Sequence, residues 1–96
     1  MGVKELLQAR RQEILCLAAR HGAYNVRVFG SAVRGESGPD SDLDFLVDVG
    51  PEHSPWFPAS LVVDLEELLG REVDVVTERA LHWYIRDRVL AEAIPL

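Results

Sequence analysis

Apolar side chains in this chain follow two spacings, helical and alternating, and the order of the two restricts the fold more than any other feature of the sequence. The helical spacing runs through residues 3–21 and 61–69, and returns after Thr77 in residues 81–89. Residues 25–29, 43–49 and 72–76 instead have the pattern of strands. The order helix, strand, strand, helix, strand, helix predicts an α/β or α+β fold, with helices packed on a small mixed β-sheet.

Local signals set the expected ends and faces of these elements. Gly22 and Gly70 are expected to end the first two helices, and Thr77 is expected to cap the third. The predicted apolar face of the third helix comprises Leu81, Tyr84, Ile85 and Val89. In the strand at 43–49, alternation puts Leu43, Phe45, Val47 and Val49 on one face and Asp42, Asp44, Leu46 and Asp48 on the other. The acidic residues of this strand are therefore expected to point away from the core.

Size and charge narrow the possible functions. A chain of 96 residues is expected to form a single domain, residues 1–96, whose core is too thin to wall a deep pocket. The net charge of −6 disfavours direct binding of nucleic acid, which needs clustered Lys and Arg. We see no signal peptide, and no segment approaches the roughly 20 apolar residues that cross a bilayer. We therefore expect a cytoplasmic protein without membrane contact, whose site is shallow or is completed by a partner.

Asp42 and Asp44 lie two positions apart at the start of a predicted strand, so their side chains are expected to share one face. Neighbouring carboxylates repel one another, and carboxylates are also the ligands that Mg²⁺ takes from proteins. A bound divalent cation would offset the repulsion. The alternative is a solvated junction between a loop and a strand, where Asp is a common residue.

A third carboxylate, Asp74, lies within a β-rich segment, where a charged side chain is disfavoured. Its neighbours Val73 and Val75 are expected to face the core, which leaves Asp74 on the opposite face. If this strand lies beside Asp42 and Asp44, three carboxylates converge and can hold two metal ions about 3.5–4 Å apart, the arrangement used in nucleotidyl transfer. The alternative is an edge-strand charge that prevents aggregation.

Gly30 and Ser31 directly follow a predicted strand. Glycine allows a sharp turn and close approach of a ligand, and free amides at a helix start bind phosphate. The stretch GSAVRGESGPDSDLDFLV, residues 30–47, resembles the pattern GSxxRGxxxxxSDxDL of the minimal nucleotidyltransferases, in the superfamily that includes DNA polymerase β. Phe45 replaces the common Leu, and residues 70–77 resemble the segment of the third acid. The matching residues are Gly30, Ser31, Arg34, Gly35, Ser41, Asp42 and Asp44.

The resemblance implies a nucleotidyltransferase fold and the transfer of a nucleoside monophosphate with release of pyrophosphate. Carried over by the resemblance, Gly30 and Ser31 would hold the β- and γ-phosphates of ATP. Asp42 and Asp44 would bind two Mg²⁺ ions, and Asp74 would bind the catalytic ion and help to deprotonate the acceptor hydroxyl.

Two charged residues of the same stretch have open interpretations. Arg34 would contact a phosphate oxygen, or would instead pair with Asp40 and hold the loop. Glu36 is interpreted as a surface charge of the loop.

Minimal nucleotidyltransferases are similar to antitoxins that adenylylate a tyrosine of a HEPN toxin. The resemblance therefore implies AMP transfer from ATP to a partner HEPN protein, in a hetero-oligomeric complex. Two alternatives stay open. One is a binding antitoxin that neutralises its partner by complex formation alone, and the other is a nucleotidyltransferase of small molecules, such as the aminoglycoside-modifying relatives.

Several residues outside the motif also carry expectations. Trp56 and Trp83 are predicted to offer contact surface to a partner, or alternatively to close a thin core. His21, His53 and His82 lack the spacing of a metal site. Cys16 has no second cysteine to pair with and is expected to be a small core residue.

Overall fold

A four-stranded mixed sheet forms the centre of the protein, in a computed structural model that describes residues 2–36, 42–53 and 55–96. The strand order is β3-β2-β1-β4. β1 (Ala23–Phe29) is antiparallel to β2 (Leu43–Val49) and to β4 (Ile94–Pro95), whereas β2 and β3 (Val73–Thr77) are parallel. This arrangement confirms the predicted fold class.

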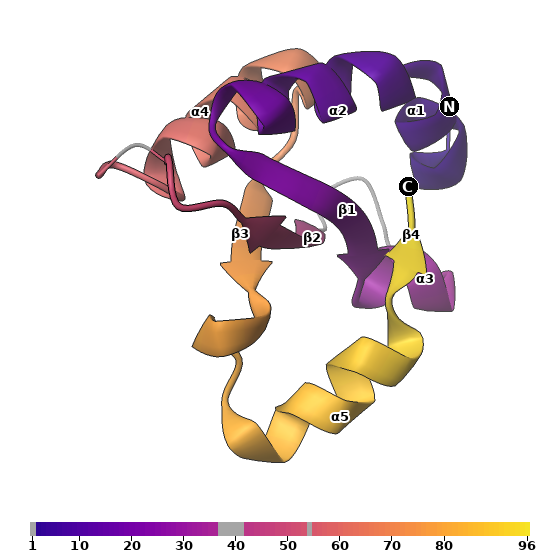
Figure 1. The fold of residues 1–96 in the computed structure, drawn as a ribbon. Coiled ribbons are helices and arrows are strands. Elements are labelled where there is room, and N and C mark those ends of the chain that lie inside the picture. The colour runs from indigo at the N-terminus through magenta and orange to yellow at the C-terminus, as the bar shows by residue number, and fades with distance from the viewer. Residues whose placement is uncertain (1, 37–41, 54) are drawn as a thin grey trace.

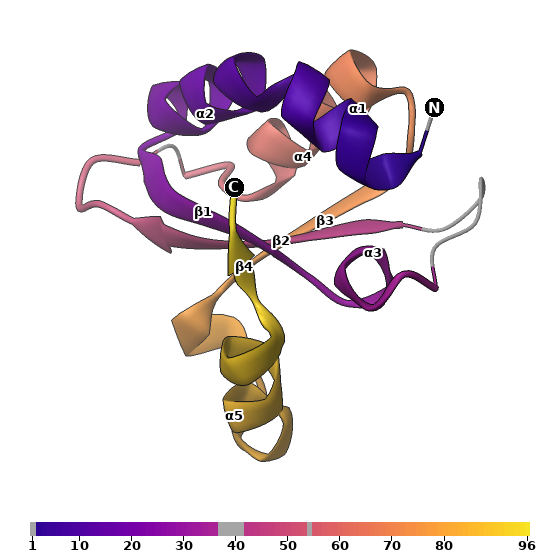
Figure 2. The same ribbon diagram turned by 90° about the vertical axis from the view of Figure 1, so that its right-hand side faces the viewer.

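Helices cover the two faces of the sheet unequally. α1 (Val3–Ala9), α2 (Arg11–Arg20) and α4 (Ala59–Leu69) lie together over one face, as Figures 1 and 2 show. The one-turn helix α3 (Ser31–Arg34) lies at the end of β1. The 3₁₀ helix η1 (Glu78–Ala80) and α5 (Trp83–Glu92) project from the opposite side of the sheet. We call this second side, which carries Asp44 and Asp74, the open face.

Alternation along β2 builds the main core. Leu43, Phe45 and Val47 are almost completely buried and pack in one cluster with Ile14 of α2 and Leu61 of α4. Burial of an aliphatic or aromatic side chain of this size contributes roughly 1.5–3 kcal/mol. The predicted alternation of β2 is therefore confirmed, and the helix-covered face holds most of the buried residues.

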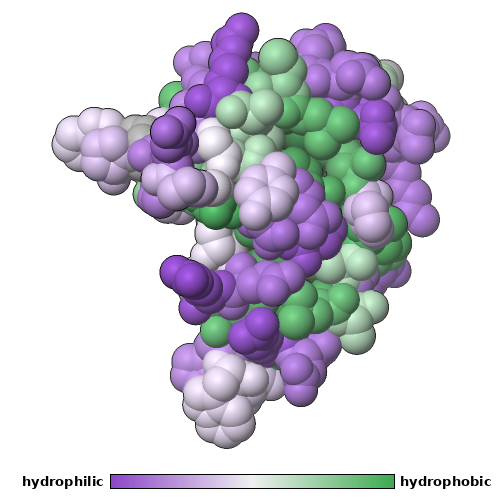
Figure 3. Space-filling view, in the orientation of Figure 1, coloured by the Kyte–Doolittle hydropathy of each residue, from purple (hydrophilic) through white to green (hydrophobic). Residues whose placement is uncertain are grey.

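A smaller buried region lies on the open face. Leu46 of β2 and Val89 of α5 are buried but do not belong to the main cluster. Figure 3 shows that the lobe formed by the start of α5 projects beyond the body, and that the outline of the molecule is hollowed beside it. The open face is thus covered only in part, which leaves room for a site.

Three elements differ from the sequence prediction. The helix expected over residues 3–21 is divided at Arg10, whose φ of −106° and ψ of 10° leave the helical range. The apolar spacing continues across Arg10, so periodicity alone could not show the break. Thr77 does cap a helix, but this helix is the short η1, where the Thr77 hydroxyl accepts a hydrogen bond from the Ala80 amide at 3.3 Å. Strand β4 was not predicted, because it has two residues and one of them is a proline.

Two predictions of burial are wrong, for reasons of helix geometry and packing. Tyr84 was expected on the apolar face of α5 but is 67% exposed, because α5 projects from the body and covers little of it. Cys16 was expected in the core but is exposed. The buried positions of α2 are Ile14 and Ala18, and a residue midway between them points to the other side of a helix.

Three further residues singled out in the sequence are Trp56, Trp83 and His21. Trp56 and Trp83 are 76% and 81% exposed, so neither closes the core. His21 joins α2 to α4, with Nε2 2.7 Å from Asp64 Oδ2 and Nδ1 3.2 Å from Ser60 Oγ. Within the described ranges, no helix has the length and apolar character needed to span a membrane.

Candidate active site

The parallel pairing of β2 with β3 brings the predicted acidic residues together. Asp44 lies directly opposite Asp74 in the register of the two strands. One step earlier, the Leu43 amide donates a hydrogen bond to the Glu72 carbonyl oxygen at 2.9 Å, which brings Asp42 to the level of Glu72. Neighbouring strands are about 4.8 Å apart. Four carboxylates therefore gather where β2 and β3 begin, on and beside the open face.

The charges of this cluster shift the pKa values of its members. The pKa of Asp44 is raised, first by burial and then by the nearby charges of Asp74 and Asp42, while Arg34 acts in the opposite direction. The pKa of Glu72 is raised because its side chain hydrogen-bonds to Asp42 and is repelled by that charge. Both shifts show unbalanced negative potential, which a bound cation would reduce.

A sharp bend at Gly30 puts the chain against this cluster. Gly30 has a φ of +80° and a ψ of −152°, a region that L-residues rarely adopt. A Cβ atom at this position would collide with Oδ2 of Asp44. Because β1 pairs Phe29 with Asp44, the bend follows at once beside the carboxylate. Position 30 therefore favours glycine for two reasons: the backbone has a positive φ, and the Asp44 side chain leaves no room for a Cβ atom.

The bend also starts helix α3. The Gly30 carbonyl oxygen accepts hydrogen bonds from the amides of Val33 and Arg34, at 3.1 and 3.2 Å. The amides of Ser31 and Ala32 belong to the first turn, where no earlier carbonyl of the helix can reach them. Ser31 is therefore the first residue of a helix that begins directly after the bend at Asp44.

Arg34, at the end of α3, pairs with two acidic side chains. Its Nε is 3.1 Å from Oε2 of Glu36, and one terminal nitrogen, Nη1, is 2.6 Å from Oε1 of Glu92. Asp40, the partner proposed from the sequence, lies outside the described residues. Glu36, interpreted as a surface charge of the loop, is 64% exposed and in addition pairs with Arg34.

Two acidic residues of this region were missed by the sequence analysis. Glu72 lies two positions before Asp74, so strand alternation could have placed it on the same face as Asp74, whereas its position beside Asp42 depends on the register of β2 and β3. Glu92 belongs to α5, far from the motif in sequence, and no local pattern connects it to Arg34.

The donor set fits a hard divalent cation. Mg²⁺ prefers carboxylate oxygens, takes one or two of them from the protein, and completes its coordination with phosphate oxygens and water. Asp42, Asp44 and Asp74 offer such oxygens on one side of the bend. In the parts of the chain that the structure describes, no three acidic, His or Cys side chains already form a group that could hold a metal ion.

A separate cleft lies at the ends of β2 and β3 that are opposite to the carboxylates. It has a volume of about 760 Å³, and its lining includes Tyr24 of β1, Val49 of β2, Phe57 of the β2–α4 loop and Arg79 of η1. None of the clustered carboxylates lines it. We place the candidate site at the carboxylates, because the close charges, the bend and the start of α3 all lie there.

A mixed sheet with two acid-bearing parallel strands and a glycine bend beside them defines the nucleotidyltransferase class of fold. The model of a family described as "Nucleotidyltransferase domain" matches residues 10–96. The chain therefore belongs to the nucleotidyltransferase domain family and is a nucleotidyltransferase.

Individual relatives agree with this assignment. The protein adenylyltransferase MntA of Thermococcus cleftensis is 39% identical over 92 residues, which cover 96% of this chain and 90% of the relative. A solved structure of a "putative minimal nucleotidyltransferase" has 52% identity and a TM-score of 0.86, and the match covers 100% of this chain and 97% of that one.

Two crystal structures of toxin–antitoxin complexes share the fold. One contains AMP-PNP and has a TM-score of 0.74 at 21% identity, with 88% of this chain and 69% of that chain covered. The other is MntA–HepT, with a TM-score of 0.66 at 19% identity and coverage of 90% and 68%. At these identities the likeness concerns the fold alone.

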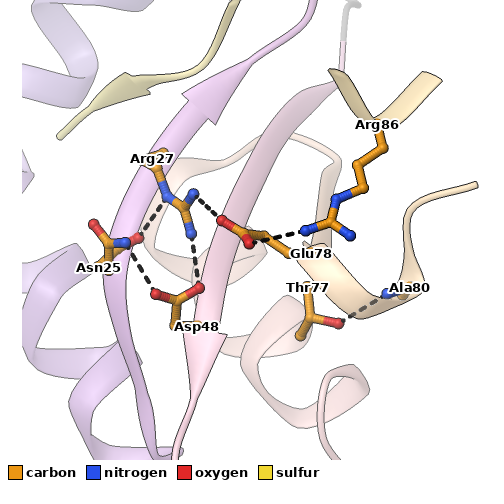
Figure 4. Close-up of polar contacts among 7 residues, drawn as sticks. All are labelled: Asn25, Arg27, Asp48, Thr77, Glu78, Ala80 and Arg86. Carbon is orange, nitrogen blue, oxygen red and sulfur yellow. Dashed lines mark hydrogen bonds and ion pairs between the residues drawn. The ribbon is translucent and has the colours of Figure 1, made fainter. Parts of the chain in front are cut away.

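A second ion-pair network lies further along the open face. Arg27 of β1 is bound by Asp48 of β2 at 2.9 Å and by Glu78 of η1 at 2.8 Å, and Arg86 of α5 reaches Glu78 at 3.6 Å. Figure 4 shows that Arg27 lies between the two carboxylates, with its Nε also bonded to the Asn25 carbonyl oxygen. The network fastens η1, and with it the start of α5, to the sheet.

Removal of the central arginine is expected to destabilise the fold strongly. The Arg27 side chain is only 11% exposed, so Arg27→Met would leave Asp48 without its counter-charge and Glu78 with only the more distant Arg86, and would lower the free energy of unfolding by about 2–3 kcal/mol. The matched control Arg86→Met, at a side chain that is 47% exposed, should cost no more than about 0.5 kcal/mol. Urea unfolding measures both, and equal losses would show that the network does not stabilise the fold.

Proposed function

We propose that this nucleotidyltransferase transfers AMP from ATP to a tyrosine hydroxyl of a partner HEPN toxin, and acts as the antitoxin of the pair. The observation that carries the proposal is the register that aligns Asp44 with Asp74 beside the Gly30 bend. The similarity to a protein adenylyltransferase supports a protein acceptor. Fold neighbours crystallised with AMP-PNP and as MntA–HepT support ATP as donor and a toxin as partner.

In this proposal each part of the site has one task. Gly30 and Ser31 bind the β- and γ-phosphates, and Arg34 contacts a phosphate oxygen. Asp42, Asp44 and Asp74 hold two Mg²⁺ ions, which when bound neutralise phosphate charge and assist departure of pyrophosphate. The dense negative charge of the acids, evident in the raised pKa of Asp44, suits them to cations rather than to direct contact with phosphate.

The reaction then follows from position and proton transfer. The acceptor oxygen attacks the α-phosphorus of ATP, a new oxygen–phosphorus bond forms, and the bond to the oxygen that leads to the β-phosphate breaks. Pyrophosphate leaves with that oxygen. The proton of the acceptor hydroxyl passes to the carboxylate of Asp74, whose residue is exposed and can meet an acceptor that arrives from outside. We place this reaction in the cytoplasm.

The proposal is tested with the protein, ATP, Mg²⁺ and the purified HEPN partner. The expected result is a mass increase of one or more AMP groups on a partner tyrosine, together with loss of the partner's ribonuclease activity. Chelation of divalent cations should abolish both effects. Loss of ribonuclease activity without any AMP on the partner would instead show a binding antitoxin. AMP transfer to a small hydroxyl compound in the absence of any protein partner would show a small-molecule enzyme.

A further inference from the structure

The ion pair between Arg34 and Glu92 joins α3 to the end of α5. Arg34 closes the helix that follows the Gly30 bend, and Glu92 is the last residue of α5. Their nitrogen–oxygen distance of 2.6 Å is that of a strong, charge-assisted hydrogen bond. The Glu92 side chain is only 16% exposed, whereas Glu36, the second partner of Arg34, is 64% exposed. The two carboxylates therefore hold Arg34 in unequal ways.

The short strand β4 explains why Glu92 lies here. β4 pairs with β1 so that Ile94 is opposite Val28. Continuing this antiparallel register by two residues brings Glu92 to the level of Gly30, next to the position where β1 pairs with Asp44. Glu92 is near enough to Asp44 that its charge is among the causes that raise the Asp44 pKa. The end of α5 thus lies at the carboxylate cluster.

The partly buried carboxylate of Glu92 beside other acidic side chains must be stabilised by some interaction. It adds negative charge to a region where several acids already repel one another, which is unfavourable by itself. Its hydrogen bond to Arg34 compensates for that charge and fixes one terminal nitrogen of the guanidinium. Arginine has five N–H donors in a rigid plane, so when Glu36 and Glu92 hold two of its nitrogens, the orientation of the remaining donors is fixed as well.

We propose that Glu92 is a positioning residue for nucleotide binding: it holds the guanidinium of Arg34 beside the Gly30–Ser31 turn, so that the remaining N–H groups meet a phosphate oxygen of ATP. This inference rests on the proposed function and adds to it a residue from the end of α5. Without Glu92, the long Arg34 side chain must be ordered when ATP binds, and the entropy lost then weakens binding.

The test separates binding from turnover, with AMP transfer to the partner measured over a range of ATP concentrations. Glu92→Ala is expected to raise KM for ATP about tenfold and to change kcat by less than about threefold, since one charge-assisted hydrogen bond is lost. Glu92→Gln keeps an oxygen that accepts from Arg34, and should stay within about threefold of wild type. Glu13→Ala, which removes an exposed ion pair with Arg10 on the helix-covered face, is the matched control and should change KM by less than about twofold.

A double-variant cycle tests whether Glu92 acts through Arg34. In the Arg34→Ala background, Glu92→Ala should have no further effect on KM, because no guanidinium remains to be positioned. Equal effects of Glu92→Ala in both backgrounds would overturn the inference, and so would a lower KM, which would mark Glu92 as a competitor of phosphate for Arg34. If wild type transfers AMP but Glu92→Ala has the same KM, the inference alone fails. If wild type neither binds AMP-PNP nor transfers AMP, the proposed function fails first.

Discussion

Replacement of Asp44 by Asn is expected to lower the rate of AMP transfer at least about a thousandfold, while the protein stays folded. Asp44 has the central place in the cluster, opposite Asp74 and beside the Gly30 bend. The substitution keeps the size of the side chain but removes the charge that would bind Mg²⁺, and metal and charge stabilisation supply several kcal/mol in such reactions. The measurement is the transfer of labelled AMP to the partner at saturating ATP and Mg²⁺.

Asp48→Asn is the matched control for this experiment. Asp48 lies further along β2, on the same face as Asp44. It accepts a hydrogen bond from Arg27 and does not belong to the carboxylate cluster. Its substitution should leave the transfer rate within about threefold of wild type at a temperature where both variants are folded. Similar losses in both variants would mean that general disturbance of β2, and not the charge of Asp44, explains the result.

The same Asp44→Asn variant should be more stable than wild type when no metal is present. The pKa of Asp44 is raised above its usual 3.8 in the folded protein, so the unfolded chain loses this proton first as pH rises, and the folded state is penalised. The stability difference between the variant and wild type should therefore be small below pH 3.8, grow as pH rises above it, and stay constant above the folded pKa. A gain of about 1 kcal/mol would raise Tm by roughly 4–8 °C.

Magnesium should reverse this order of stability. Binding to the folded wild type raises its Tm, whereas the variant, with one carboxylate fewer, should respond much less. Thermal unfolding at pH 7, with and without Mg²⁺, measures both effects. A wild type whose Tm is unaffected by Mg²⁺ and Mg²⁺–ATP would contradict the assignment of these carboxylates as metal ligands.

Gly30→Ala is expected to lower AMP transfer by at least about a hundredfold, because the new methyl group occupies the place of the Asp44 carboxylate and a displacement of about 1 Å is enough for such a loss. It should also lower the free energy of unfolding by about 1–3 kcal/mol, the cost of this backbone conformation in a residue with a Cβ. Because Asp44 Oδ2 is the end of a movable side chain, the carboxylate can turn away, and we expect activity to suffer more than stability.

Gly70→Ala separates backbone strain from steric displacement. Gly70 also has a positive φ, +66°, but a Cβ there would meet no atom of the described residues within 4 Å. The variant should lose about 1 kcal/mol of stability and keep its transfer rate. In an Asp44→Ala background, the part of the Gly30→Ala destabilisation that comes from the collision should disappear. An active Gly30→Ala enzyme would show that the close approach of the bend to Asp44 has no catalytic value.

The sequence was most informative where neighbouring residues alone determine the local structure. Alternation in residues 43–49 predicted the inward side chains of β2, and the structure confirms them through the burial of Phe45. Gly70 ends α4 in the left-handed conformation, as a glycine after an apolar helical run predicts. The sequence spacing of Gly30, Asp42 and Asp44 indicated the family, because the bend at Gly30 and the start of the strand that carries the two acids must lie side by side to form the site.

The sequence was least informative where contacts join distant segments. That Asp74 pairs with Asp44 depends on the register between two strands separated by a whole helix, which the residues of neither strand specify. Glu92 reaches Arg34 only because β4, too short to have a pattern, aligns the end of α5 with β1. The exposure of Tyr84 likewise depends on where α5 projects, and its own spacing suggested the opposite.

The parallel arrangement of β2 and β3 has a consequence for the order in which a newly made chain acquires its parts. Since β3 can join β2 only after α4 has crossed over the sheet, a polypeptide emerging from the ribosome carries Gly30, Asp42 and Asp44 well before it gains Asp74. The contact from Glu92 can form only after α5 has been made and β4 has paired with β1. A chain made in this order lacks the complete proposed site until α5 and β4 have been made, and chains cut short before residue 74 lack one of the proposed ligands altogether.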